Sequence, residues 1–164
     1  MIRRAVFLLA AYFLAVFLCV PAAEAAFGID LNFYSIDFGD LDMGTVKDDV
    51  PSQGLVATCT TDQGNAWYLM IRNEQPLQNV NNPAAVIPDT NFYWYGVAPV
   101  ITDVTGNNSL VTSYQDFTYE KTAYTGQAGE GAAGTQITLK FKVDVPNPAQ
   151  SGEYHSRVVL TFTE

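Results

Sequence analysis

Strict two-residue alternation near the end of the chain is the feature that most constrains its fold. The odd positions of this segment are Thr135, Ile137, Leu139, Phe141, Val143 and Val145. The even positions between them are Gln136, Thr138, Lys140, Lys142 and Asp144. Successive side chains of an extended strand point to opposite faces of a sheet. The segment therefore predicts a β-strand with one buried face and one face in water.

A second strand is expected over residues 154–163. Its inward side chains would be Tyr154, Val158, Leu160 and Phe162, and its outward side chains Arg157 and Thr161. The connection before it, residues 146–152, contains two prolines and a glycine, which are typical of turns. We therefore expect 135–145 and 154–163 to form an antiparallel hairpin of a β-sandwich. The basic side chains of the pair, Lys140, Lys142 and Arg157, are expected to be exposed.

The N-terminus has the three parts of a secretory signal peptide. Arg3 and Arg4 are basic, residues 5–20 are apolar, and Ala23-Glu24-Ala25 supplies the small residues that signal peptidase needs. The apolar run approaches the length of a membrane span, but the small-residue motif favours cleavage after Ala25. No later apolar stretch is long enough to span a membrane. We expect residues 1–25 to be removed and residues 26–164 to form one exported domain, extracellular or at the cell surface after transit through the periplasm.

Charge and cysteine content narrow the range of partners. Without the signal peptide the chain keeps six basic and sixteen acidic side chains, a net charge near −10. Such a charge repels nucleic acid and anionic lipid, so neither is an expected partner. Cys59 is then the one remaining cysteine, which excludes an intramolecular disulfide. Its phase with Leu55 and Ala57 predicts a buried thiol; a thiol that bridges two subunits is the alternative.

Other strands and turns recur at the spacing of a sandwich, and no segment has a helical period. Strands are expected over 27–38, 55–61, 66–72 and 92–95, with weaker candidates at 110–114 and 117–119. Residues 73–91, with three prolines, are expected to form a long loop, and the glycine-rich residues 126–134 a flexible one. The predicted fold class is all-β, an Ig-like antiparallel β-sandwich that follows the cleaved signal peptide.

No residue pattern typical of catalysis is present. His155 is the single histidine, and the common nucleophile and zinc motifs are absent. The acidic stretch around Asp40, Asp42, Asp48 and Asp49 lacks the ligand spacing of a calcium loop. We therefore expect no enzyme activity, no cofactor and no metal site.

Four consecutive aromatic residues, Phe92-Tyr93-Trp94-Tyr95, are the one indication of a ligand site. Alternation places Tyr93 and Tyr95 on the face opposite Phe92 and Trp94. Because exposed aromatic rings can stack on sugar rings, Tyr93 and Tyr95 are candidate ligand-facing residues. In the alternative interpretation, one pair enters the core and the other packs under the loop of residues 73–91.

The first strand changes phase along its length. Its first half has apolar residues at Phe27, Ile29, Leu31 and Phe33, and its second half at Tyr34, Ile36 and Phe38. A change of phase indicates a bulge or a crossing between sheets, and it divides the segment into an arm, residues 27–33, and a strand that starts the domain. Such arms can complete the sheet of a neighbouring subunit, so Phe27, Ile29, Leu31 and Phe33 are candidate assembly residues. Alternatively, the whole segment pairs within its own domain.

Three short motifs resemble exported bacterial pilin-type β-sandwiches: Ile36-Asp37-Phe38-Gly39, Val56-Ala57-Thr58-Cys59-Thr60 and Trp67-Tyr68-Leu69. Within that group the chain is similar to the spore-coat-protein-U-like proteins of chaperone–usher systems. Its closing segments, Gly134-Thr135, Ser151-Gly152-Glu153-Tyr154 and Val159-Leu160-Thr161, also resemble the last hairpin of WxL-type surface domains. The chain departs from the pattern in two places: it lacks a cysteine near the mature N-terminus to pair with Cys59, and it ends Phe162-Thr163-Glu164 instead of in a tyrosine-containing motif.

The resemblance implies an extracellular structural or adhesive role, with self-association or other pilus and coat subunits, and a periplasmic chaperone, as partners. The predicted function is a structural or adhesive subunit of a surface fibre or coat that assembles by β-strand addition through its N-terminal arm. The alternative is a monomeric, secreted carbohydrate- or surface-binding module.

Overall fold

The computed structural model describes residues 27–106 and 109–164. The signal peptide expected at residues 1–25 lies outside the described residues. The described part is all-β: it contains twelve strands, one short 3-10 helix, η1 (Asp89–Asn91), and no α-helix. No helix in this part of the chain has the length and hydropathy needed to cross a membrane.

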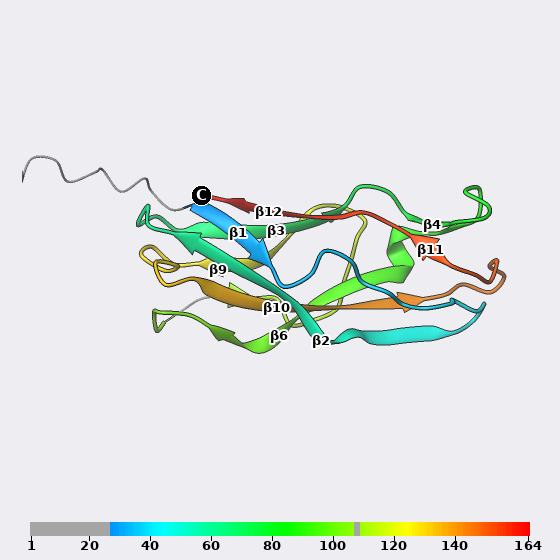
Figure 1. Cartoon of the computed structure of the whole chain (residues 1–164), viewed down its shortest axis with the longest axis horizontal. Coiled ribbons are helices and arrows are strands. Elements are labelled where there is room, and N and C mark those ends of the chain that lie inside the picture. Colours follow the sequence, from blue (N-terminus) through cyan, green and yellow to red (C-terminus); the bar gives the residue numbers. More distant parts are fainter. Residues whose placement is uncertain (1–26, 107–108) are drawn as a thin grey trace, which may run out of the picture.

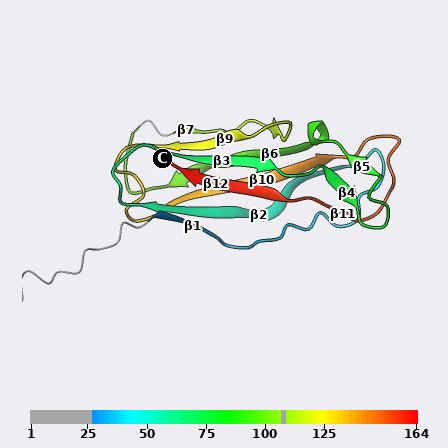
Figure 2. The same cartoon turned by 90° about the horizontal axis from the view of Figure 1, so that it is seen from above.

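The strands form three antiparallel sheets (Figures 1 and 2). The five-stranded sheet, in the order β1-β2-β10-β6-β8, contains β1 (Phe27–Leu31), β2 (Val46–Thr61), β6 (Phe92–Ile101), β8 (Gln115–Asp116) and β10 (Thr135–Asp144). The four-stranded sheet, in the order β12-β3-β9-β7, contains β3 (Trp67–Asn73), β7 (Ser109–Leu110), β9 (Lys121–Gly126) and β12 (Val158–Thr163). A small sheet, β11-β4-β5, lies at one end of the elongated domain and contains β4 (Leu77–Asn79), β5 (Val86–Ile87) and β11 (Tyr154–His155).

The two larger sheets share one hydrophobic core. Strand β10 contributes Ile137, Leu139, Phe141 and Val143, all fully buried, as its alternation predicts. From the other sheet, β3 contributes Trp67, Leu69 and Ile71, which alternate in the same way. Because each strand buries every second side chain, each sheet needs the other to cover its apolar face. The structure is therefore β-sandwich-like, as predicted.

The predicted hairpin between 135–145 and 154–163 is wrong. Strand β10 lies between β2 and β6, whereas the second segment divides into β11 and β12, and β12 pairs with β3 in the other sheet. Residues 146–152 thus lead from β10 to β11 of the small sheet, and the chain enters the other layer only at β12. Alternation identifies the buried face of a strand but not its neighbour. Because β12 is an edge strand, Val158, Leu160 and Phe162 are partly buried against the core instead of fully enclosed.

The expected exposure of the basic side chains is confirmed for Arg157 only. Its side chain is 75% exposed, whereas that of Lys140 is 15% exposed and that of Lys142 is 23% exposed. Both lysines lie on the outer face of the five-stranded sheet, where tyrosine and aspartate side chains cover them. A sheet face that points away from the core can still be covered by the loops of its own domain.

Several strand boundaries also differ from the prediction. Strand β2 begins at Val46, and β6 continues to Ile101. The predicted loop of residues 73–91 contains β4, β5 and η1, and β9 was not predicted. Prolines at positions 76, 83 and 88 flank β4 and β5, which are therefore too short to show a clear alternation.

The glycine-rich segment after β9 is held by two carboxylates, Glu130 and Asp103. Glu130 is fully buried, and its carboxylate accepts hydrogen bonds from the Tyr124 hydroxyl at 2.6 Å and the Thr102 hydroxyl at 2.8 Å. Asp103 accepts two more from the backbone N–H groups of Gly131 and Ala133. The segment predicted to be a flexible loop is thus tied to the sheet on both sides.

Candidate functional site

A groove of about 560 Å³ lies between the N-terminal segment and the C-terminal strands. One bank consists of the end of β1 and residues 33–39; the other consists of β11, Ser156 and the start of β12. Its floor is apolar and contains Leu55, Leu77, Phe92 and Phe141. Partly buried apolar side chains line the banks: Ile29, Leu31, Phe33, Ile36, Phe38, Val158 and Leu160.

One bank of the groove is a segment without a strand partner, residues 33–40, which we call the strap. At its start, the side chain of Asn32 accepts a hydrogen bond from the Val56 N–H at 2.9 Å and donates one to the Gly54 carbonyl at 3.3 Å. Just beyond its end, Leu41 and Gly152 exchange two backbone hydrogen bonds at 3.0 and 3.1 Å. Between these anchors, no backbone hydrogen bond joins residues 33–40 to another described residue.

The other bank is an open strand edge. Among the described strands, β12 pairs with β3 on one side and has no neighbour on the other. An edge strand of this kind presents a row of N–H and C=O groups that can pair with another chain. One end of the groove lies near the stacked rings of Phe27 and Phe162, whose centroids are 4.3 Å apart, and the other lies near the Leu41–Gly152 bridge. The groove therefore has two backbone edges, an apolar floor and defined ends.

This geometry can accept an extended peptide segment. A strand between the strap and β12 can form hydrogen bonds on both sides, and alternate side chains can enter the apolar floor. Burial of one Val, Leu or Ile side chain contributes about 1.5–3 kcal/mol. In the described segments, no group of three or more His, Cys, Asp or Glu side chains could hold a metal ion.

The four candidate assembly residues lie beside the groove. Strand β1 pairs antiparallel with β2 of the same chain, with Phe27 opposite Thr61 and Leu31 opposite Ala57. Ile29 and Leu31 pack partly against the core, Phe33 belongs to the strap, and Phe27 is 46% exposed. In the single chain residues 27–31 therefore pair within their own domain, as the alternative expected, but the second half of the predicted strand, residues 33–38, forms no strand. Its donation to a neighbour stays a prediction.

The candidate ligand-facing tyrosines lie elsewhere, on the outer face of the five-stranded sheet, which we call the tyrosine face. As alternation predicts, Phe92 and Trp94 enter the core and Tyr93 and Tyr95 point away from it. As the alternative also expected, one pair enters the core; the ring contacts of the other pair, Tyr93 and Tyr95, lie outside residues 73–91. Both tyrosines pack against Tyr114, whose ring centroid lies 6.4 Å from that of Tyr93 and 4.8 Å from that of Tyr95.

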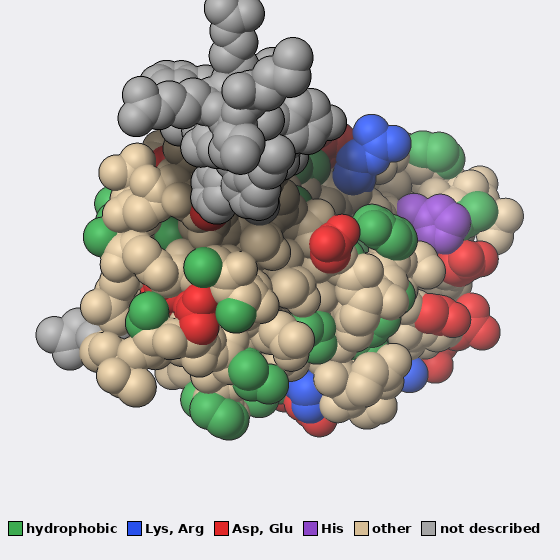
Figure 3. Space-filling model, turned by 60° about the vertical axis from the view of Figure 1, so that its left-hand side comes forward, with side chains coloured by type: hydrophobic (Ala, Val, Ile, Leu, Met, Phe, Trp, Pro, Cys, Tyr) green, Lys and Arg blue, Asp and Glu red, His purple; other side chains and the backbone are tan. Residues whose placement is uncertain are grey.

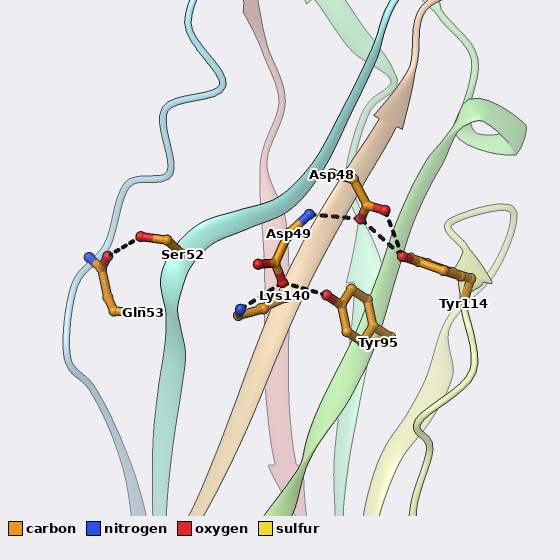
Figure 4. Close-up of polar contacts among 7 residues, drawn as sticks. All are labelled: Asp48, Asp49, Ser52, Gln53, Tyr95, Tyr114 and Lys140. Carbon is orange, nitrogen blue, oxygen red and sulfur yellow. Dashed lines mark hydrogen bonds and ion pairs between the residues drawn. The ribbon is translucent and has the colours of Figure 1, made fainter.

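Polar groups of the tyrosine face pair with one another (Figure 4). The Tyr95 hydroxyl donates a hydrogen bond to Asp49 Oδ1 at 2.8 Å, and Lys140 Nζ lies 2.6 Å from the same oxygen. The Tyr114 hydroxyl donates to Asp48 at 2.8 Å. In addition, Lys142 Nζ lies 5.2 Å from the ring centroids of both Tyr93 and Tyr114 and so occupies ring surface that a ligand would need.

These contacts shift the acidity of the groups on the tyrosine face. Hydrogen bonds from Lys140 and then Tyr95 lower the pKa of the Asp49 carboxyl below its ordinary value. Burial, followed by the hydrogen bond to Asp49, raises the pKa of Tyr95, and the hydrogen bond to Asp48, followed by burial, raises that of Tyr114. Both phenols therefore remain protonated donors at neutral pH, and the network acts as a set of fixed hydrogen bonds.

Cys59 is buried, as its strand phase predicts. It lies opposite Ile29 of β1 and Thr135 of β10. Burial raises the pKa of its thiol to about 12. Since the thiolate is the reactive form of cysteine, this thiol is a packing residue in the folded chain.

Comparison of the chain with protein-family models, with curated proteins and with solved structures gives no match. The function must therefore be inferred from the geometry of the groove and the tyrosine face.

Proposed function

We propose that this protein is an exported structural or adhesive subunit of a surface fibre or coat, without catalytic activity, that assembles by β-strand addition. The groove is the observation that carries the proposal. Its two backbone edges lack partners within the described chain, and its apolar banks are only partly buried. A partner strand would satisfy both the backbone groups and the apolar side chains.

The strand order supports an Ig-like assignment with one strand absent. The order β1-β2-β10-β6 matches the A-B-E-D sheet of an Ig-like sandwich, and β12-β3 matches its F-C pair. Strand β9 extends the second sheet on the far side of β3. In this assignment the open edge of β12 is the place of strand G, and the groove is the space that G would fill. In the proposed assembly, a partner therefore supplies the strand that is absent from this chain.

Within this scheme the N-terminal arm is the strand that the chain is proposed to donate to a partner subunit, but in the single chain it is already paired with β2. Donation by residues 27–33 requires separation of β1 from β2 and loss of the Asn32 hydrogen bonds to Val56 and Gly54. Assembly through this arm is therefore an exchange of one pairing for another. The tyrosine face gives weaker support to a carbohydrate-binding module, because Lys142 already covers rings of Tyr93 and Tyr114.

Peptide binding to the mature protein, residues 26–164, tests the proposal. The probe is a peptide as long as the strap, with Val, Ile or Leu at alternate positions and Ser or Thr between them. Leu160 lines the groove, whereas its neighbour Thr161 is exposed. We expect Leu160→Glu to weaken binding at least about tenfold and Thr161→Glu to leave it unchanged, as measured by fluorescence anisotropy.

A second measurement on the unaltered protein covers the case in which Leu160→Glu does not fold. The peptide should shift the methyl NMR signals of Val158 and Leu160, which line the groove, and leave that of Val97 on β6 unchanged. A folded mature protein that binds no such peptide would refute the proposed function.

A further inference from the structure

We infer that the strand that fills the groove belongs to a different, basic protein and not to a second copy of this chain. The inference rests on the proposed function and adds the chemistry of the partner. It follows from the charges around the groove, from the charge of the whole domain, and from the state of the N-terminal arm.

Charged side chains at the groove are mostly acidic. Asp37 lies on the strap bank, and Glu153 lies on the opposite bank with His155, whose Nε2 is 2.9 Å from the Glu153 carboxylate. Among the described residues, no Lys or Arg lines the groove. On the face drawn in Figure 3, red acidic side chains lie beside and below the purple histidine. A strand that enters between these banks therefore places its outward side chains next to carboxylates.

The acidic character extends along the whole N-terminal bank. Residues 27–46 contain four aspartates, Asp30, Asp37, Asp40 and Asp42, and neither Lys nor Arg. All four are exposed. At physiological ionic strength, charges within about 8 Å of one another still interact appreciably. Basic side chains on an inserted strand would therefore gain attraction from this bank, and acidic ones would be repelled.

Most basic side chains of the described domain already face carboxylates. Ion pairs join Lys121 to Asp116, Lys140 to Asp49, Lys142 to Asp144, and both Arg72 and Arg157 to Glu74. The domain thus has little positive charge to offer an acidic partner. With a net charge near −10 for residues 26–164, two copies repel each other, whereas a basic chain is attracted over a distance.

The chain's own arm is also a poor occupant of this groove. It carries Asp30 and no basic residue. Every residue of β1 pairs with β2 in its own domain, and Phe27 stacks on Phe162. A second copy would have to give up these contacts and then place an aspartate on an acidic bank. A basic strand from another protein has neither cost.

Three peptides with the same alternating apolar residues test the inference. They carry Lys, Ser or Glu at the outward positions. At low salt we expect the lysine peptide to bind the mature protein at least about tenfold more tightly than the glutamate peptide, with the difference shrinking at high salt. Asp37→Asn/Glu153→Gln should reduce this difference, and Glu120→Gln/Asp48→Asn, an equal change of charge away from the groove, should preserve it.

Two further peptides test whether binding depends on the apolar side chains and whether the chain's own arm can bind in the groove. A lysine peptide with serine at the apolar positions should bind weakly; equal binding would show non-specific attraction to the acidic surface and overturn the inference. Peptide 26–33 of this chain should also bind weakly, and binding as tight as that of the lysine peptide would favour a second copy. If all three alternating peptides bind equally, the inference fails while the proposed function stands. If none binds, the proposed function fails as well.

Discussion

The groove and the tyrosine face differ in how many of their polar and apolar groups find partners within the chain itself. On the tyrosine face, the hydroxyls of Tyr95 and Tyr114 and the ammonium of Lys140 all have partners within the chain. In the groove, the strap and the outer edge of β12 lack strand partners among the described residues. Apolar side chains such as Ile36 and Leu160 are only partly covered there.

The comparison teaches that residue type alone is a weak sign of a binding surface. The consecutive aromatic residues are conspicuous in the sequence, yet Lys142 and Tyr114 cover Tyr93. The strap is less conspicuous, but its backbone has no hydrogen bond to another described strand, and its apolar side chains are only partly buried against the core. A surface with both deficits gains more from a partner than a surface whose groups already pair.

The largest expected effect is the difference in stability loss between substitutions on the two faces of β10. Phe141 is fully buried under the groove, and its ring packs against those of Phe92 and Phe117, whereas Lys140 lies on the tyrosine face. We expect Phe141→Ala to lower the free energy of unfolding by about 3–5 kcal/mol. Lys140→Ala removes one ion pair to a largely exposed Asp49 and should destabilise the fold much less. Urea denaturation measures both, and equal losses would contradict the assignment of the two faces.

A smaller effect, the labelling rate of Cys59, reports whether the arm beside the groove stays paired with β2. Because Cys59 is buried opposite Ile29 and has a raised thiol pKa of about 12, a thiol reagent should label it at least about a hundredfold more slowly in the folded protein than in urea. Cys59→Ala should leave strand binding intact. Rapid labelling of the free protein would show that β1 separates from β2 readily and would make the arm a better donor than the structure suggests.

The sequence predicts which face of each strand is buried better than it predicts which strands pair with each other. Ile137, Leu139 and Phe141 are buried as alternation requires, because the two-residue period of a strand is a local property. The partner of a strand depends on the whole sheet, and the predicted pairing of 135–145 with 154–163 therefore fails. Strand β9 was missed because its apolar residues, Ala123 and Tyr124, are adjacent and do not alternate.

The candidate site was predicted in part for the same reason. The change of phase after Phe33 predicts a bulge or crossing followed by a second strand; instead β1 ends at Leu31, and the strap that follows forms no strand. No local pattern shows that the strap lies across the groove from β12, because that arrangement depends on how residues 146–157 carry the chain from β10 to the other sheet. Likewise, Tyr114 lies in a segment with weak strand character, so its packing on Tyr93 and Tyr95 could not be predicted.

The smallest expected effect tests whether the tyrosine face is internally satisfied. Hydrogen bonds from Lys140 and Tyr95 hold the pKa of Asp49 below its ordinary value of 3.8. A carboxyl whose pKa is lower in the folded state stabilises the fold fully above about pH 4, and this contribution is lost as the pH falls through the folded-state pKa. Asp49→Asn should therefore lower the midpoint of urea denaturation slightly at pH 7, and the difference from the unaltered protein should vanish near pH 2. Asp62→Asn, at an exposed carboxylate away from these contacts, is the matched control and should show no such convergence. If Asp49→Asn instead changes peptide binding and leaves the pH dependence of stability unaltered, the tyrosine face would be a binding surface, and its contrast with the groove would no longer hold.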